Sequence, residues 1–143
     1  MSLRASIDVG SNTLRLLIAD VRDNKIIDIY SDRKITRLGD GIDSAGRLTD
    51  KNIEDSLTVL KGFSAVIAEY GVGDIRAVAT SAVREAANAD IFIKKALNET
   101  GIAIEIIPGV KEAELTLKGI LLSFESTKPG ISFTSAQSNQ SGG

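Results

Sequence analysis

The chain has 143 residues, which matches the usual size of one globular domain and is enough to bury a hydrophobic core without disulfide or metal cross-links. Its 17 basic and 19 acidic residues give a formal net charge of −2, which argues against a general binder of nucleic acids or anionic membranes. The sequence holds no Cys and no His, which excludes disulfides, thiolate zinc sites and mechanisms that need a thiol or an imidazole, so catalysis must use carboxylates, Arg, Lys, hydroxyls and backbone amides.

The first part of the chain has the pattern of three β-strands. Residues 4–9 alternate between apolar and polar side chains, residues 14–21 are apolar on both faces, as in a central strand, and residues 26–36 follow the turn signal Asp23-Asn24. The short turns between them predict an antiparallel meander. No apolar run approaches the roughly 20 residues of a membrane span, and no signal peptide is apparent, so we expect a cytoplasmic protein that binds no membrane.

A long amphipathic helix is predicted after a loop rich in Gly and Asp. Thr49 or Asp50 can cap its beginning, and Gly71 or Gly73 ends it. Apolar residues recur at helical spacing along this segment, at Ile53, Leu57, Leu60, Phe63 and Ile67.

The chain then alternates between strands and helices. Strands are predicted at 75–80 and 102–107, and helices at 81–98, with a break near 88–90, and at 110–124. The order βββ-α-β-α-β-α predicts an α/β fold with a mixed five-stranded sheet, in which two parallel strands extend the meander.

The end of the chain differs in composition. From residue 134 to 143 every side chain is small or polar and none is charged, so this segment cannot bury enough surface to order itself. We therefore assign residues 1–125 to one domain and residues 126–143 to a linker or tail.

The junction of the first two strands is the first candidate site, with the sequence Asp8-Val9-Gly10-Ser11-Asn12-Thr13. Glycine in a tight turn lets successive backbone amides face one concavity that can hold phosphate oxygens, and Ser11, Asn12 and Thr13 add side-chain donors. Asp8 can hold Mg²⁺ directly or through water. The plain alternative is an ordinary hairpin turn, because the same residue types favour turns.

Two further candidates stand where a strand runs into a helix. Thr80 and Ser81 begin a helix whose free amides attract anions, and Arg84 can bind a phosphate with two hydrogen bonds. Glu112 lies beside Ala113 in a first helical turn, where a carboxylate can activate water. Alone, each is better explained by a helix cap, a solvated arginine or the helix dipole.

A loop supplies the fourth candidate. It contains Arg37, Leu38 and Gly39, followed by Gly41 and Ile42, and is either a mobile loop with one phosphate-binding Arg or an ordinary surface loop. The other three candidates follow strands whose carboxyl ends meet at one edge of the sheet, where α/β proteins collect ligands. Together they indicate a phosphate-handling site.

These four segments, in this order and spacing, resemble the exopolyphosphatase / guanosine pentaphosphate phosphohydrolase family over about residues 4–124. The matching segments are Asp8 to Thr13, Leu38 to Ile42, Ala79 to Ala86 and Gly109 to Leu115. That family belongs to the superfamily of actin, sugar kinases and heat-shock chaperone ATPases, whose catalytic unit has two ribonuclease-H-like domains with the active site between them. The resemblance implies that this chain is the first of those domains.

The resemblance also implies a role for each candidate residue. Asp8 would help to hold the catalytic Mg²⁺, Arg84 would bind phosphate near the reacting group, and Glu112 would orient and deprotonate the attacking water. The phosphate-binding residues would be Gly10, Ser11, Asn12, Thr13, Thr80 and Ser81. The reaction would be hydrolysis of the terminal phosphoanhydride of polyphosphate or of the 5′-phosphate of guanosine pentaphosphate.

The sequence departs from the family pattern in two places. The family's second domain opens with Asp-Ile-Gly-Gly-Gly-Ser, where this chain has Gln137 to Gly143, and Val110 and Lys111 precede Glu112 where the family usually carries more acid. We therefore expect a lone first domain that is inactive without the second, with an uncovered face that favours a homodimer. The alternatives are a phosphate- or nucleotide-sensing module, half of a complex completed in trans, or a kinase or ATPase relative, which the segment Ala79 to Arg84 disfavours.

Overall fold

A computed structural model describes residues 2–23, 25–42, 46–79, 83, 85–107 and 117–122. The elements are β1 (Leu3–Val9), β2 (Thr13–Arg22), β3 (Lys25–Ile35), α1 (Asp50–Glu69), β4 (Asp74–Ala79), α3 (Ala89–Thr100), β5 (Ile104–Ile106) and α4 (Leu117–Leu122). This order confirms the predicted succession of strands and helices. The predicted tail, 126–143, lies outside the described residues.

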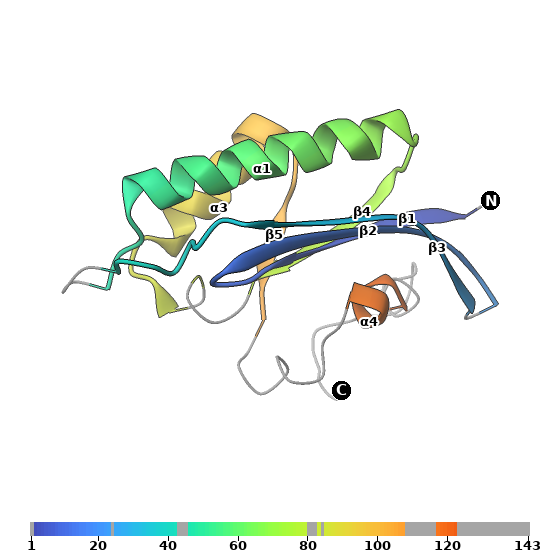
Figure 1. Cartoon of the computed structure of the whole chain (residues 1–143), viewed down its shortest axis with the longest axis horizontal. Coiled ribbons are helices and arrows are strands. Elements are labelled where there is room, and N and C mark those ends of the chain that lie inside the picture. The colour runs from blue at the N-terminus through green and yellow to red at the C-terminus, as the bar shows by residue number, and fades with distance from the viewer. Residues whose placement is uncertain are drawn as a thin grey trace, which may run out of the picture.

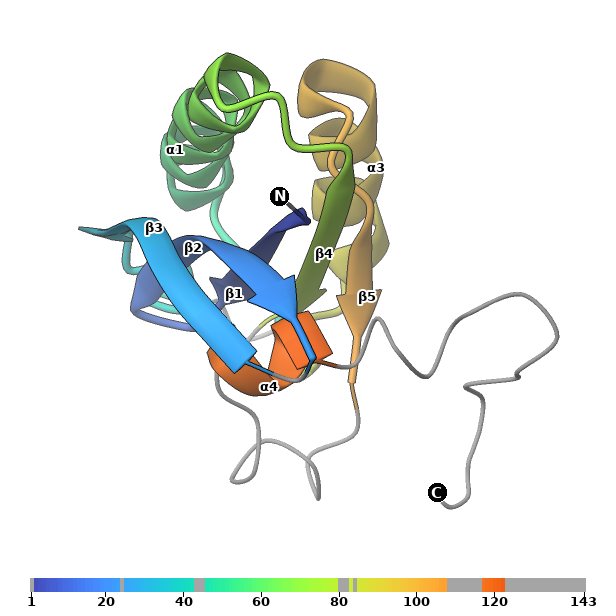
Figure 2. The same cartoon turned by 90° about the vertical axis from the view of Figure 1, so that its right-hand side faces the viewer.

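The five strands form one sheet in the order β3-β2-β1-β4-β5. β2 pairs antiparallel with both β1 and β3, whereas β4 pairs parallel with β1 and with β5, as can be followed in Figure 2. The meander extended by two parallel strands is therefore confirmed, and it is the mixed sheet expected of a ribonuclease-H-like domain. β1 lies at the centre and carries the first candidate site at its carboxyl end.

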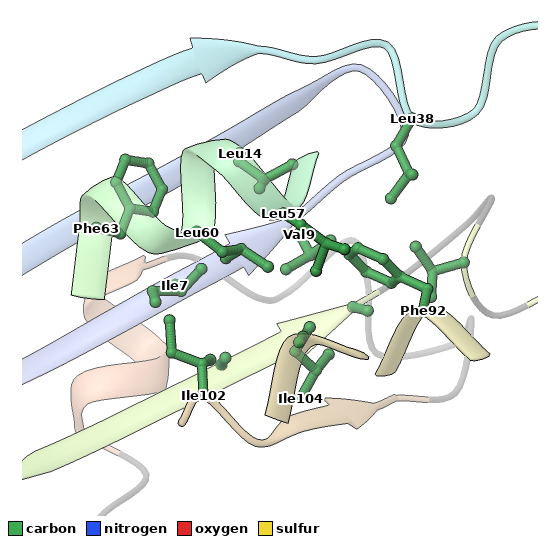
Figure 3. Close-up of a cluster of buried hydrophobic side chains, with 14 of the residues drawn as sticks. Ile7, Val9, Leu14, Leu38, Leu57, Leu60, Phe63, Phe92, Ile102 and Ile104 are labelled. Carbon is green, nitrogen blue, oxygen red and sulfur yellow. The ribbon is translucent and has the colours of Figure 1, made fainter. Parts of the chain in front are cut away.

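Helices cover both faces of this sheet. α1 and α3 lie side by side on one face, and α4 lies on the other (Figures 1 and 2). β2 is apolar on both faces for this reason: Leu16 and Ile18 belong to the large core cluster on the first side, while Leu17 and Ala19 pack with Leu121 of α4 on the second. Figure 3 shows the large cluster. The predicted central strand is confirmed.

The helix boundaries follow from capping residues. The Thr49 hydroxyl accepts the Asn52 N–H (3.1 Å) at the start of α1, and Gly71, at φ +71°, allows the chain to turn away at the end. Gly101 does the same for α3 at φ +78°. All the apolar positions predicted for α1 are buried, at Ile53, Leu57, Leu60, Phe63 and Ile67.

Some predicted boundaries differ from those in the structure. β5 covers Ile104–Ile106, shorter than the predicted 102–107, although Ile102 is buried in the core. The helical segment after β4 is interrupted at Asn88 as predicted, and α3 then runs two residues further than expected, to Thr100. Within the described ranges, no helix is long and apolar enough to cross a membrane.

Two contacts tie distant parts of the fold together. Arg4 of β1 donates from Nη1 to the Leu121 carbonyl of α4 (3.1 Å), which attaches this helix to the sheet. The Asn88 side chain donates to the Leu48 carbonyl (3.1 Å) and accepts the Leu48 N–H (2.8 Å). Asn88 thus holds the segment before α1 against the start of α3.

Candidate functional site

The first candidate site is the tight turn between β1 and β2. The Gly10 N–H donates to the Thr13 carbonyl across the turn (3.1 Å). A Cβ atom at position 10 would lie 3.1 Å from that same oxygen, a distance that few side chains tolerate. Glycine is therefore favoured here by close backbone approach, which agrees with the predicted turn.

The carbonyl groups of this turn are occupied by a neighbouring loop. The Thr36 and Arg37 N–H groups both donate to the Asn12 carbonyl (3.0 Å each), and the Gly39 N–H donates to the Ser11 carbonyl (2.8 Å). These hydrogen bonds hold the turn in place from one side, and they occupy the carbonyl oxygens of Ser11 and Asn12, which are the negative ends of the peptide dipoles.

The amide groups of the same turn remain available. Ser11 and Asn12 are exposed, and their N–H groups have no acceptor within the part of the chain that the structure describes. A turn with engaged carbonyls and free amides is a concave set of positive dipole ends, which is the arrangement that binds oxyanions. This is a more specific feature than the ordinary hairpin turn considered as the alternative.

Charged side chains flank the turn. Asp8 is half-buried near the end of β1, and its cross-strand neighbour on β2 is Arg15. Arg15 in turn lies directly opposite Arg33 of β3, and both arginines are exposed. Like charges directly opposite each other are unfavourable, so this row favours the approach of an anion.

No sequence motif singles out Arg15 and Arg33. The available signal was weak: Arg15 is the basic residue within a run that is otherwise apolar except at Asp20. Its alignment with Arg33 and Asp8 depends on strand register, which the sequence does not display.

The loop at residues 36–41 is anchored to the domain. Leu38 is fully buried and points into the core cluster (Figure 3), and Asn52 donates from Nδ2 to the Asp40 carbonyl (2.8 Å). The three hydrogen bonds to the turn add to this anchoring. Of the two interpretations of this segment, a mobile loop fits less well than a loop fixed beside the turn, with the exposed Arg37 at its surface.

The strand ends meet as the parallel pairing predicts. Val9 of β1 aligns with Ala79 of β4, and Ala79 aligns with Ile106 of β5. The segments that follow these strands therefore begin at one edge of the sheet. The candidates Thr80, Ser81, Arg84 and Glu112 belong to two of those segments and lie outside the described residues.

The donor set limits what kind of metal site is available. In the described ranges, no group of three or more His, Cys, Asp or Glu side chains gathers as a metal site would. Asp8 is the carboxylate beside the turn. One carboxylate suits Mg²⁺, which keeps several waters and takes its other ligands from substrate phosphates.

Comparison with known proteins gives consistent matches. A model of the Ppx/GppA phosphatase family matches residues 17–133. A bifunctional 3-dehydroquinate synthase/phosphatase of Fusobacterium nucleatum is 43% identical over 130 residues, which cover 86% of this chain and 20% of that protein. Exopolyphosphatase 2 of Mycobacterium tuberculosis is 36% identical over 124 residues, which cover 80% of this chain and 39% of that protein.

Solved structures show the same similarity. A Ppx/GppA family member from Aquifex aeolicus superimposes with a TM-score of 0.70 at 40% identity, covering 73% of this chain and 34% of that one. An exopolyphosphatase from Cytophaga hutchinsonii gives a TM-score of 0.74 at 32% identity, covering 78% and 36%. The chain thus spans 20% to 39% of the length of these relatives.

Proposed function

Because the chain belongs to the Ppx/GppA phosphatase family, we propose that it forms the N-terminal domain of a Mg²⁺-dependent phosphohydrolase. The substrate is inorganic polyphosphate or guanosine pentaphosphate, from which the enzyme releases the terminal phosphate. Relatives named exopolyphosphatase support the substrate class. The fraction of their length that this chain spans supports its assignment as one domain of a larger enzyme.

The observation that carries the proposal is the turn at residues 10–13. Its free Ser11 and Asn12 amides, with the Ser11 and Asn12 carbonyls engaged elsewhere, offer hydrogen bonds to the oxygens of a phosphate group. Transfer of a phosphoryl group depends mainly on positioning and on neutralising charge. Fixed backbone dipoles supply both without needing a His or Cys side chain.

Mg²⁺ fits the donors beside this turn. Asp8 would hold the ion, either directly or through water, together with phosphate oxygens. When bound, the ion neutralises negative charge on the phosphates.

The remaining roles belong to residues of the two segments that follow β4 and β5. Thr80 and Ser81 would contribute further phosphate contacts, and Arg84 would bind the reacting phosphate with its planar guanidinium. Glu112 would orient the attacking water and take its proton, since a carboxylate is the natural general base in a chain without His. Stabilising the charge of the transferred phosphoryl group requires donors from both sides of the active site, and the second side belongs to the second domain. The 143-residue chain alone is therefore expected to be inactive.

The experiment is a titration of the chain with polyphosphate, followed by calorimetry and by NMR of the backbone amides. We expect binding that requires Mg²⁺, that shifts the Ser11 and Asn12 amide signals, and that Asp8→Asn weakens. Binding that leaves both amide signals unchanged would contradict the proposed role of the turn. A parallel titration with guanosine pentaphosphate distinguishes the two substrates.

An assay of phosphate release tests the expected inactivity. The unaltered chain alone should release phosphate from polyphosphate no faster than the Glu112→Gln variant does. Release that Glu112→Gln abolishes would show that a single domain suffices. Tight binding without release even when the second domain is supplied in trans would instead favour the sensing module.

A further inference from the structure

A polar pocket lies between the end of β3 and the first turns of α1. It encloses about 560 Å³, and its polar lining comprises Thr36, Arg37, Asp40, Lys51, Asn52 and Asp55. We propose that this pocket holds an interior phosphate of a polyphosphate chain whose terminal part lies at the turn of residues 10–13, with Arg37 as the main anion-binding group. This inference rests on the proposed function and adds a second subsite to it.

Thr36 and Arg37 of this pocket carry side-chain donors that have no acceptor among the described residues. Thr36 is only 8% exposed, and its hydroxyl has no hydrogen-bond partner among the residues described. Because that oxygen is also shielded from solvent, a ligand in the pocket would meet the next residue, Arg37, rather than this hydroxyl. Arg37 is exposed and makes no ion pair within the described ranges, which leaves the five N–H donors of its guanidinium available.

The acidic residues of the pocket set the charge that it accepts. Asp55 is already paired with Lys51 (2.7 Å), so these two side chains largely cancel each other. Asp40 and Arg37 also line the pocket with one charge of each sign, so its four charged side chains sum to zero. A neutral lining attracts no anion by itself, so binding depends on direct contact with Arg37, and an interior phosphate with a single negative charge keeps the repulsion from Asp40 small. A free phosphate with two charges would be repelled by Asp40 more strongly.

The position of the pocket relative to the turn is fixed. The backbone N–H groups of Thr36 and Arg37 both bind the Asn12 carbonyl, so the pocket and the turn share one wall. Leu38, which follows them, is fully buried. None of the turn residues 10–13 is among the pocket's lining residues, so a phosphate chain must extend past residues 36 and 37 to occupy both places.

The backbone of Arg37 supports a functional role for this residue. Its φ is +53°, in the left-handed region that non-glycine residues rarely adopt. Such conformations cluster at ligand-binding sites. The first turns of α1 border the pocket through Lys51 and Asn52, and the positive end of a 20-residue helix favours an anion there.

The test compares a short ligand with a long one on the 143-residue chain. Pyrophosphate is too short to occupy both subsites, whereas long-chain polyphosphate reaches both. We expect Arg37→Gln to weaken binding of the long chain by about tenfold to a hundredfold and to leave pyrophosphate binding unchanged. Lys25→Gln, which removes one positive charge at the far end of β3, should change neither.

Each other result overturns part of the reasoning. If Arg37→Gln weakens both ligands equally, Arg37 serves the turn and the second subsite is wrong. If long-chain binding is unaffected, the subsite is wrong while the proposed function stands. If the unaltered chain binds neither ligand, the proposed function fails, and the subsite fails with it.

A second variant separates loss of the guanidinium from loss of the fold. Arg37→Gly suits the positive φ and retains the backbone N–H that binds Asn12, while it removes the guanidinium. It should therefore fold at least as stably as the unaltered chain by thermal unfolding, and it should reproduce the loss of long-chain binding. In NMR titrations, the Thr36 signal should shift with the long chain and not with pyrophosphate.

Discussion

Replacing Leu38 with alanine removes the side chain that anchors the loop at residues 36–41 to the core. Leu38 is 0% exposed, so all three deleted carbons lose a buried environment. At ~0.8 kcal/mol per methylene the transfer contribution is about 2.4 kcal/mol. The cavity left behind adds to this, and measured Leu→Ala substitutions of this kind cost about 3 to 5 kcal/mol. We expect a loss of about 3 kcal/mol, because a loop can collapse partly into the space.

Urea unfolding measures this loss, and Leu97→Ala is the matched control. Leu97 lies on α3 and is 50% exposed, so the same chemical deletion should cost about 1 kcal/mol or less. Hydrogen exchange should also quicken at the Thr36, Arg37 and Gly39 amides, which bind the turn. A loss for Leu38→Ala no larger than that for Leu97→Ala would refute the claim that Leu38 fixes this loop.

Further predictions concern the turn, the Asn88–Leu48 hydrogen bonds before α1, which we call the Asn88 clamp, and the N-terminus. Gly10→Ala should weaken Mg²⁺-dependent polyphosphate binding clearly while it changes the melting temperature little. The added Cβ displaces the turn by a few tenths of an ångström but does not require a forbidden φ. Asn88→Ala should cost about 1 to 3 kcal/mol in urea unfolding, since it leaves both backbone groups of Leu48 without their partners. The hydrogen bond from the Ser2 N–H, assisted by a neighbouring arginine, holds the pKa of Asp20 below its usual value against the opposing effect of burial. Asp20 therefore stabilises the fold above its unfolded-state pKa of 3.8, and this contribution fades as the pH falls through the lower folded-state pKa. Melting temperatures from pH 5 to pH 2 should thus converge between the unaltered chain and Asp20→Asn. The homodimer expected from the sequence would be seen as a mass that rises with concentration in light scattering.

Controls for these predictions come from the same elements. Asn98→Ala on the exposed side of α3 should have little effect beside Asn88→Ala, and equal effects would mean that the clamp contributes nothing. Asp28→Asn on the exposed part of β3 should leave the acid dependence intact. A pH-independent difference between the unaltered chain and Asp20→Asn would contradict the assigned pKa shift. A constant monomer mass would argue against the homodimer.

Much of the fold could be predicted because its signals are local. Helical spacing of apolar residues and the capping residue Thr49 defined α1, and Gly101 marked the end of α3. Apolar residues on both faces of β2 required cover on both sides of the sheet. The rule that parallel strands end together brought the turn, and the segment after Ala79, to one edge.

The details of the site depend on contacts that no local pattern displays. The donation of Thr36 and Arg37 to the Asn12 carbonyl joins segments 24 and 25 residues apart. Nothing in the neighbouring sequence indicates that Arg37 adopts a positive φ. The alignment of Arg15 with Arg33 appears only once the register of β2 and β3 is known. Sequence patterns therefore predict the edge where the candidate segments meet, while the proposed second subsite needed the tertiary structure.

The central place of β1 has a consequence for synthesis on the ribosome. β1 is made first, yet its parallel partner begins about seventy residues later, since Arg4 aligns with Asp74. At about 5 to 20 residues per second this gap lasts several seconds. β2 and β3 can cover one side of β1 early, but the other edge stays open to pairing with a second nascent chain. The carbonyl of Leu121 that Arg4 binds emerges later still, so the domain can close around its first strand only after residue 121 has been made.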